Sequence, residues 1–102
     1  MKTDLYQQPD YYNMDDLLSE EHKLVRDAAR AWVKKEVSPI IDEHYEKATF
    51  PMHILSGLGE IGAFGPYIPA EYGGPGLDQI SYGLIMQELE RCDSGLRSTA
   101  SV

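Results

Sequence analysis

Apolar residues recur every three or four positions along much of this chain, which is the spacing of a helix that buries one face. The clearest stripe follows Ser19 and consists of Leu24, Val25, Ala28, Ala29, Trp32, Val33 and Val37. Ser19, followed by two acidic residues, is typical of a helix N-terminus, because its hydroxyl accepts a free backbone N–H. The basic residues of the segment fall on the opposite face: Arg26, Arg30 and Lys34. No segment alternates apolar and polar residues for long enough to predict a β-strand, so the sequence predicts an all-α fold.

Prolines and glycines divide the middle of the chain. Proline suits the first position of a helix, so Ser38-Pro39 and Phe50-Pro51 each predict a helix start. The second helix is expected from Pro39 to about Ala48, with Ser38 as its cap, and is expected to bury Ile40, Ile41 and Tyr45. A third is expected from Pro51 to Gly62. Residues 63–77 hold three prolines and four glycines, which predicts a long loop of the kind that is often functional.

The last quarter of the chain, residues 78–102, predicts a helix, a sharp break and the start of another helix. Asp78 is expected to cap the first of these, and its apolar stripe is Ile80 or Ser81 with Leu84, Ile85, Met86, Leu89 and Cys92. The break falls at Asp93-Ser94-Gly95. The whole chain is therefore expected to hold about five helices and one Pro/Gly-rich loop.

Composition excludes several classes of function. The 102 residues carry 17 Asp and Glu against 9 Lys and Arg, a net charge of −8 without a basic cluster, which argues against nucleic acids and anionic membranes. A single cysteine allows no internal disulfide, and no apolar run is long enough to span a bilayer. Without a targeting peptide, the expected location is the cytoplasm of a bacterium. Residues 1–16 are polar and tyrosine-rich, and we expect an irregular arm there.

No catalytic set can be assembled from the remaining candidates. Gly57-Leu-Gly-Glu-Ile-Gly62 matches the pyrophosphate-binding pattern GxGxxG, but that pattern requires a preceding strand, so helix packing and a helix end are the favoured explanation. The three histidines lack the spacing of metal ligands, and no metal site is predicted: His22, His44 and His53. Cys92 is expected to be a small buried residue. Glu88 and Glu90 with Arg91 are expected to make surface or inter-helix ion pairs.

Arg97 differs from these residues because it follows the helix break and lies among small hydroxyl residues, in Ser94-Gly-Leu-Arg-Ser98. A guanidinium group near a helix start suits recognition of a carboxylate, because its planar fork of donors matches the two carboxylate oxygens. A structural ion pair is the alternative.

Four stretches together resemble the N-terminal helical domain of the acyl-CoA dehydrogenases, in that family's order and spacing. They are Leu17-Leu-Ser-Glu-Glu-His-Lys-Leu-Val-Arg-Asp27, the Phe50-Pro51 helix start, Ile68-Pro-Ala-Glu-Tyr-Gly-Gly-Pro-Gly-Leu77 and Gln87-Glu-Leu-Glu-Arg91. The resemblance implies such a domain over residues 17–102, truncated at its C-terminal end. Within the family, the stretch from Tyr82 to Ser98 most resembles glutaryl-CoA dehydrogenase.

That resemblance implies that Arg97 contacts the distal carboxylate of the substrate and that Ser98 lines the acyl pocket. It also implies FAD as cofactor, an acyl-CoA thioester such as glutaryl-CoA as substrate, electron-transfer flavoprotein as electron acceptor, and a homotetramer. The catalytic glutamate and most flavin contacts are expected outside this chain, which should be an inactive fragment on its own. Two alternatives stay open: another acyl-CoA dehydrogenase subtype in which Arg97 is structural, and a stand-alone helical interaction module.

Overall fold

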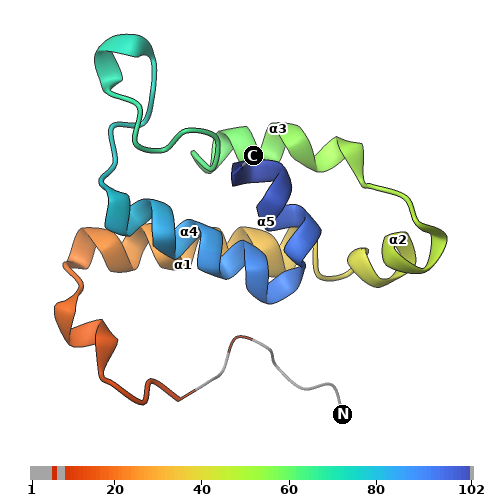
Figure 1. Ribbon diagram of the computed structural model, residues 1–102, viewed down its shortest axis with the longest axis horizontal. Helices are drawn as coiled ribbons and strands as arrows, with labels where there is room; N and C mark the ends of the chain where they lie inside the picture. Colours follow the sequence, from red (N-terminus) through yellow and green to blue (C-terminus); the bar gives the residue numbers. More distant parts are fainter. Residues whose placement is uncertain (1–5, 7–8, 102) are drawn as a thin grey trace.

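The computed structural model describes Tyr6 and residues 9–101, and its elements are helices joined by turns and loops (Figure 1). The five α-helices are α1 (Glu20–Glu36), α2 (Ile41–Lys47), α3 (Leu55–Glu60), α4 (Gln79–Cys92) and α5 (Ser94–Ser101). Three short 3-10 helices are η1 (Met14–Leu17), η2 (Met52–Ile54) and η3 (Ala70–Tyr72). The described residues include no strand, so the all-α prediction is confirmed. None of the described helices is both long and apolar enough to cross a bilayer.

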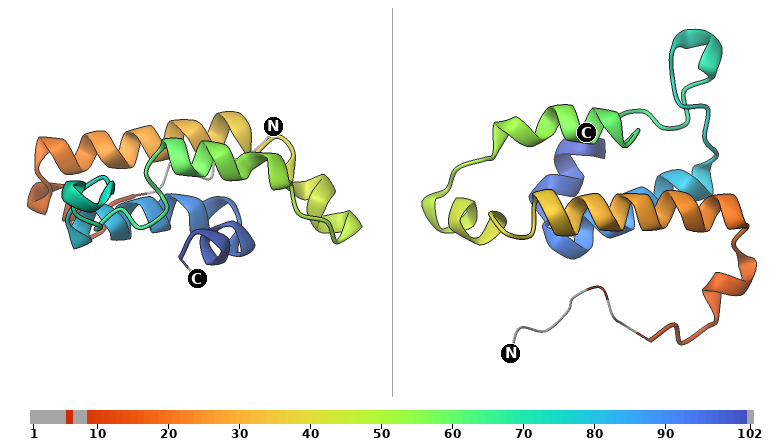
Figure 2. Two further views of the ribbon diagram at one scale, coloured as in Figure 1. Left: turned by 90° about the horizontal axis from the view of Figure 1, so that it is seen from above. Right: turned by 180° about the vertical axis from the view of Figure 1, so that it is seen from behind.

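Helices α1 and α4 lie side by side and run in the same direction, and they form the centre of the fold (Figures 1 and 2). Both begin as predicted. The hydroxyl of Ser19 accepts the backbone N–H of His22, and the carboxylate of Asp78 accepts that of Ser81. His22 Nε2 lies 2.7 Å from Asp78 Oδ2, so one side-chain contact links the two N-termini.

The core is the apolar layer between these two helices and the elements that cover them. Its buried members are Ala29, Val33 and Val37 from α1, Ile85 and Leu89 from α4, Ile54, Leu58 and Ala63 from the η2–α3 region, Leu96 from α5, and Tyr6. The predicted stripes therefore share one core. Two members of the first stripe are exceptions: Leu24 is 70% exposed, and Ala28 is also exposed.

The second helix differs from its prediction. It begins at Ile41 without a side-chain cap, so the expected start at Pro39 with Ser38 as cap was wrong. The hydroxyl of Ser38 lies instead 3.1 Å from the Tyr6 hydroxyl and 3.7 Å from Cys92 Sγ, and is therefore committed to a tertiary contact. Tyr45 is 81% exposed, because the helix turns the face of Ile41 and His44 toward the protein.

The third predicted helix is divided into η2 and α3, and its glycines have a packing role. A Cβ atom built on Gly57 would lie 2.7 Å from the indole of Trp32, so α3 approaches α1 closely only because this residue lacks a side chain. Gly62 has a φ of 77° and follows the end of α3. A 3-10 helix precedes the motif, so its explanation by helix packing and a helix end is confirmed.

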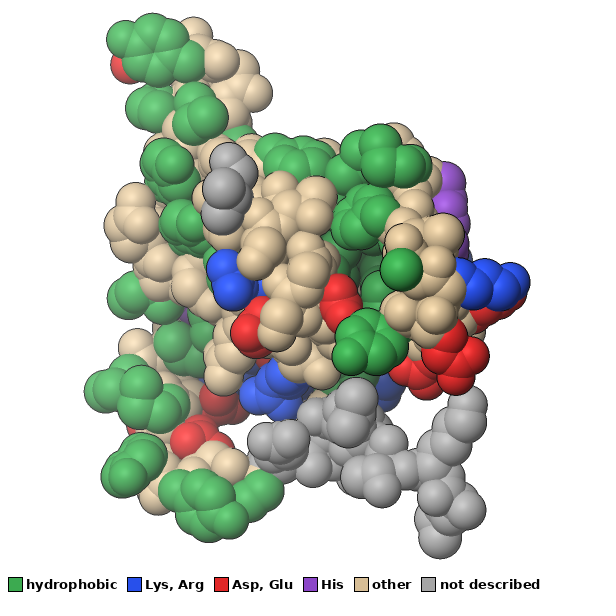
Figure 3. Space-filling model, turned by 45° about the vertical axis from the view of Figure 1, so that its right-hand side comes forward, with side chains coloured by type: hydrophobic (Ala, Val, Ile, Leu, Met, Phe, Trp, Pro, Cys, Tyr) green, Lys and Arg blue, Asp and Glu red, His purple; other side chains and the backbone are tan. Residues whose placement is uncertain are grey.

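The loop between α3 and α4 projects from the helices and closes on itself (Figure 1). The backbone N–H groups of Gly76 and Leu77 donate to the carbonyls of Ile68 and Pro66, at 2.9 and 2.8 Å. The ring of Tyr67 stacks on that of Tyr82 in α4, with 5.3 Å between centroids. Figure 3 shows apolar side chains along this edge of the molecule; those of the loop are Phe64, Tyr67, Ile68 and Tyr72, each at least 39% exposed.

Candidate functional site

The break between α4 and α5 fixes the position of the candidate carboxylate-binding residue. Asp93 donates its backbone N–H to Leu89 and thereby ends α4, in an extended conformation. Its carboxylate then accepts the backbone N–H of Leu96 at 3.0 Å, at the start of α5. Leu96 is fully buried and anchors α5 to the core. Arg97 and Ser98, which follow it, are each partly buried.

The guanidinium group of Arg97 makes two contacts with side chains. Its Nε donates to Glu90 Oε2 in α4 at 3.2 Å, and its Nη1 donates to Ser101 Oγ at 3.4 Å. The ion pair expected under the structural alternative therefore exists. Ser101 joins Arg97 on this side of α5, whereas the hydroxyl of Thr99 donates to the carbonyl of Gly95. Carboxylate binding by Arg97 and the pocket role of Ser98 stay predictions.

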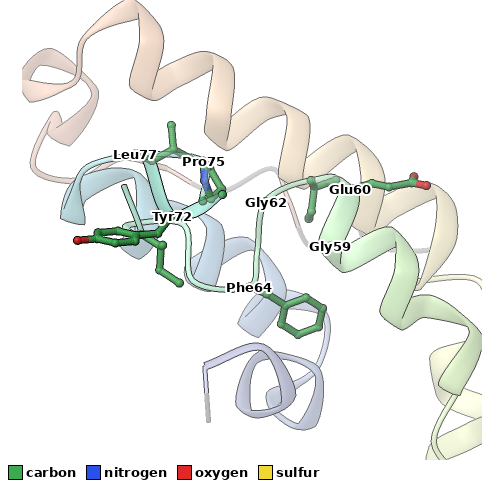
Figure 4. Close-up of a pocket in the computed structure, with 11 residues that line it drawn as sticks. Gly59, Glu60, Gly62, Phe64, Tyr72, Pro75 and Leu77 are labelled. Carbon is green, nitrogen blue, oxygen red and sulfur yellow. The ribbon is translucent and has the colours of Figure 1, made fainter. Parts of the chain in front are cut away.

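Three cavities of the described part lie away from Arg97. One, of about 510 Å³, lies between the end of α3 and the projecting loop, and its lining includes Gly59, Phe64, Tyr72 and Leu77 (Figure 4). Another, of about 540 Å³, lies between residues 9–18 and helices α1 and α4. A third, of about 400 Å³, is lined by residues of α1, η2 and α3, including Trp32 and Gly57. Neither Arg97 nor Ser98 lines any of the three.

Two of the three candidate histidines have structural partners. His22 contacts Asp78, and His44 Nδ1 lies 2.8 Å from the Thr49 hydroxyl. No group of three or more His, Cys, Asp or Glu side chains that could hold a metal ion occurs among the described residues. Burial raises the pKa of the Cys92 thiol, although the Ser38 hydroxyl works in the opposite direction. A raised thiol pKa is the opposite of what an activated nucleophile needs.

Two ion pairs of α4 were predicted only in general terms. Arg30 donates from Nε and Nη2 to the two carboxylate oxygens of Glu88, each at 3.1 Å, and Glu88 is fully buried. Arg30, which was expected only on the face opposite the apolar stripe, therefore contacts α4. For Arg97 an ion pair was expected as the structural alternative, but its partner Glu90 was not named, because the two residues belong to different helices separated by the break.

Residues 19–102 match the family described as "Acyl-CoA dehydrogenase, N-terminal domain". This chain belongs to the acyl-CoA dehydrogenase family. Its described α-helices are therefore those of the family's all-α N-terminal domain. The predicted family is confirmed. The assignment to the glutaryl-CoA subgroup stays a prediction.

Several relatives from bacteria share about two fifths of the aligned residues. The "3-(aryl)acrylate reductase" of Clostridium sporogenes is 41% identical over 73 residues, which are 72% of this chain and 19% of that protein. The "Probable acyl-CoA dehydrogenase YngJ" of Bacillus subtilis is 38% identical over 87 residues, 83% of this chain and 23% of that protein. The "Caffeyl-CoA reductase-Etf complex subunit CarC" of Acetobacterium woodii is 41% identical over 81 residues, 78% and 21%. The chain thus spans about a fifth of the length of these relatives.

The acyl-CoA dehydrogenase family implies FAD, and the described residues can be tested against it. A pyrophosphate is held by free backbone N–H groups at a glycine turn that opens a helix. The glycine motif of this acyl-CoA dehydrogenase domain does not fit, because Gly57 lies inside α3 against Trp32 and Gly62 follows its end. No flavin contact is therefore assigned to these glycines.

Proposed function

We propose that residues 17–102 form the N-terminal helical domain of an FAD-dependent acyl-CoA dehydrogenase that oxidises glutaryl-CoA, with residues 1–16 as a polar arm. The observation that supports glutaryl-CoA as the substrate is the position of Arg97. Its guanidinium is partly exposed and lies beside Ser98 on the helix that follows the break at Asp93. In this proposal Arg97 binds the distal carboxylate and Ser98 lines the acyl pocket. A bidentate guanidinium–carboxylate contact provides both affinity and orientation.

The reaction of the parent enzyme is removal of the α-proton of the thioester by a glutamate outside this chain, followed by decarboxylation to crotonyl-CoA. FAD supplies the acceptor for the β-hydride when it is bound. The role of this domain is to position the acyl chain relative to the catalytic glutamate and FAD, because positioning contributes much of the rate acceleration in such reactions.

The remaining features of the parent enzyme belong to the same proposal. Electron-transfer flavoprotein is the proposed electron acceptor, and the name of the Acetobacterium woodii relative, which is a subunit of a reductase-Etf complex, supports it. We also propose a homotetramer in the bacterial cytoplasm, acting in amino-acid catabolism.

Another member of the same family is the second candidate. Two of the relatives are named as reductases, which favours a parent enzyme that reduces an unsaturated acyl group and in which Arg97 is purely structural. Turnover of glutaryl-CoA, butyryl-CoA and an arylacrylyl-CoA by the full-length enzyme separates these candidates. Preferred reduction of the arylacrylyl-CoA would overturn the glutaryl-CoA proposal.

The site is tested with Arg97→Ala in the full-length enzyme. Loss of one partner of a desolvated charge pair costs about 2–5 kcal/mol, so kcat/KM for glutaryl-CoA should fall by roughly tens to thousands of fold. Turnover of butyryl-CoA, which lacks the carboxylate, should change little. Arg97→Lys keeps the charge without the fork and should fall between the two. Lys47→Ala, in an exposed ion pair far along the chain, is the control for loss of a positive charge.

Equal losses of kcat/KM for glutaryl-CoA and butyryl-CoA would contradict the carboxylate role of Arg97. They would indicate that Arg97 has only a structural role, through its ion pair with Glu90.

A further inference from the structure

The cavity of about 540 Å³ lies between residues 9–18 and the helices α1 and α4. Its size is that of a small-molecule site, for which the range is about 300–1,000 Å³. Residues 9–18 turn back beside the two helices and form one wall (Figure 1). The carboxylate of Asp10 accepts the backbone N–H groups of Met14 and Asp15, at 2.9 and 3.0 Å, and Arg26 of α1 donates to Asp15 at 2.7 Å. This wall is therefore held against α1.

One face of α4 forms the floor of this cavity. The floor residues recur at helical spacing and change from apolar to polar along the helix: Ile80, Gly83, Leu84, Gln87 and Arg91. A Cβ atom built on Gly83 would have no atom within 4 Å, so the floor is open at this position. Met14 and Leu18 of the opposite wall add apolar side chains to the lining. The cavity is thus an apolar space that ends at the guanidinium group of Arg91.

The guanidinium group of Arg91 makes no hydrogen bond within the part of the chain that the structure describes. Its ion contact is with Glu88 Oε1, 3.7 Å from Nε, which is too long for a hydrogen bond. Both oxygens of Glu88 already accept from Arg30, at 3.1 Å each. No buried side-chain nitrogen or oxygen among the described residues lacks a partner, so the donors of Arg91 reach open space, although only 22% of its side chain is exposed.

Two guanidinium groups face a single carboxylate at this end of the cavity. Arg30 and Arg91 carry two positive charges against the one negative charge of Glu88. Arg26, closer to the start of α1, is matched by two acidic side chains, at 2.7 and 3.0 Å. The end near Arg91 therefore has one positive charge in excess, in a chain whose net charge is −8. The planar donors of a guanidinium match the two oxygens of a carboxylate, so one further carboxylate would balance this end.

We propose that this cavity binds a small monocarboxylate with an apolar body, whose carboxylate contacts Arg91 and whose body lies along Gly83 and Leu84. From Gly83 to Arg91 the helix rises about 12 Å, which is close to the length of an extended phenylbutanoate. The site is separate from the proposed acyl pocket and does not rest on the proposed function, because Arg97 and Ser98 do not line it.

The probe is a butanoate with a fluorophenyl group, whose fluorine NMR signal reports binding to the full-length enzyme. We expect saturable binding with a Kd of about 1 mM or below, the affinity of a ligand with about thirteen non-hydrogen atoms at ordinary ligand efficiency. The methyl ester of the probe keeps the apolar body and removes the charge. It should bind about tenfold more weakly or worse, because hydrogen bonds to a charged carboxylate are lost.

Substitutions on the floor test the two parts of the site. Arg91→Ala removes the guanidinium and should raise the Kd of the probe by about tenfold or more. Arg91→Lys keeps the charge without the planar donors and should fall between this variant and wild type. Gly83→Leu leaves Arg91 in place and fills the open floor, so it should also raise the Kd by about tenfold or more. Lys47→Ala, in an exposed ion pair on α2, is the control for loss of a positive charge and should leave the Kd unchanged.

Arg97→Ala separates this cavity from the proposed acyl pocket, which offers the probe a second arginine. An unchanged Kd in Arg97→Ala supports the inference. A Kd that rises in Arg97→Ala and stays unchanged in Gly83→Leu would place the probe in the acyl pocket and overturn it. Absence of saturable binding, equal binding of the methyl ester, or an unchanged Kd in Arg91→Ala would overturn it as well. Should Arg91→Ala fold poorly because Glu88 loses a partner, Gly83→Leu decides by the same Kd.

Discussion

Glu88 and Arg30 form a two-bonded ion pair between α4 and α1, in which the carboxylate is fully buried and both guanidinium donors lie 3.1 Å from it. The hydrogen bond to Glu88 is the largest cause of the raised pKa of Arg30, whereas desolvation by burial acts in the opposite direction. Arg91, one helical turn along, lies 3.7 Å from the same carboxylate. The buried carboxylate of Glu88 therefore links the parallel helices α1 and α4, and it is compensated by the guanidinium groups of Arg30 and Arg91.

Removal of Arg30 should destabilise the protein strongly, because it leaves the carboxylate of Glu88 buried without its main partner. Breaking a buried pair costs about 3–5 kcal/mol, and we expect Arg30→Ala to lower the free energy of unfolding by that amount. Denaturant unfolding of variant and wild-type chains measures it.

The matched comparison for this prediction is Lys47→Ala, which breaks the exposed pair with Glu43 and should cost less than about 1 kcal/mol. The double variant Arg30→Met with Glu88→Leu should cost less than Arg30→Ala alone, because no charge is left in the core. Equal losses from Arg30→Ala and Lys47→Ala would show that water reaches Glu88.

Two helical glycines should respond in opposite ways to alanine. At Gly57 the new Cβ would lie within 3 Å of the Trp32 indole, so Gly57→Ala must displace α3 or the ring and should cost about 1–3 kcal/mol. At Gly83, an exposed position of α4, no atom lies within 4 Å of the added Cβ. Gly83→Ala should therefore stabilise the protein by about 1 kcal/mol through helix propensity. Thermal unfolding of both variants tests the pair, and a harmless Gly57→Ala would show that α3 is not held against Trp32.

The sequence was sufficient to predict features that depend on local contacts. Ser19 and Asp78 cap their helices as expected, and the break at Asp93 lies where the pattern placed it, since a cap needs only a side chain and a backbone N–H three residues away. Ser38 has the same kind of side chain as Ser19, but it does not cap a helix. Its hydroxyl is taken by Tyr6 and Cys92, which are distant in sequence, and α2 begins without it.

The remaining differences arise from contacts between helices. Helical spacing places Arg30 with other basic residues, opposite the apolar stripe, but it cannot show that a carboxylate from α4 will be buried against it. Tyr45 was expected to be buried on the second helix together with Ile40 and Ile41, and the short α2 leaves it exposed. The contact between Glu90 and Arg97 spans a break whose angle no periodicity describes.

Cys92 should react slowly with thiol reagents in the folded protein. Burial raises the pKa of its thiol, and the thiolate is the reactive form, so little of it is present near neutral pH. Because this is the single cysteine of the chain, the release of a chromophore from an aromatic disulfide reagent reports it alone. The rate should be well below that of the same chain unfolded in guanidinium chloride, which is the control. A folded rate equal to the unfolded rate would contradict a shielded thiol.

Asp78 should make the stability of the protein depend on pH in the acid range. The contact with His22, followed by the backbone N–H of Ser81, lowers the pKa of its carboxyl from 3.8 to about 2. A carboxyl whose pKa is lower in the folded state stabilises the protein above the unfolded-state pKa, and this contribution is lost as the pH falls through the folded-state value. The stabilisation should therefore be complete above about pH 4 and should disappear toward pH 2.

Asp78→Asn tests this directly, because an amide oxygen can still accept from Ser81 while the charge facing His22 is lost. The midpoint of urea unfolding should differ between wild type and variant above pH 4, and this difference should shrink between pH 4 and pH 2. Asp16→Asn, at an exposed position, corrects for the change in net charge. A difference that stays constant across this range would mean that Asp78 acts through its hydrogen-bonded cap alone, and that its charge does not join α1 to α4.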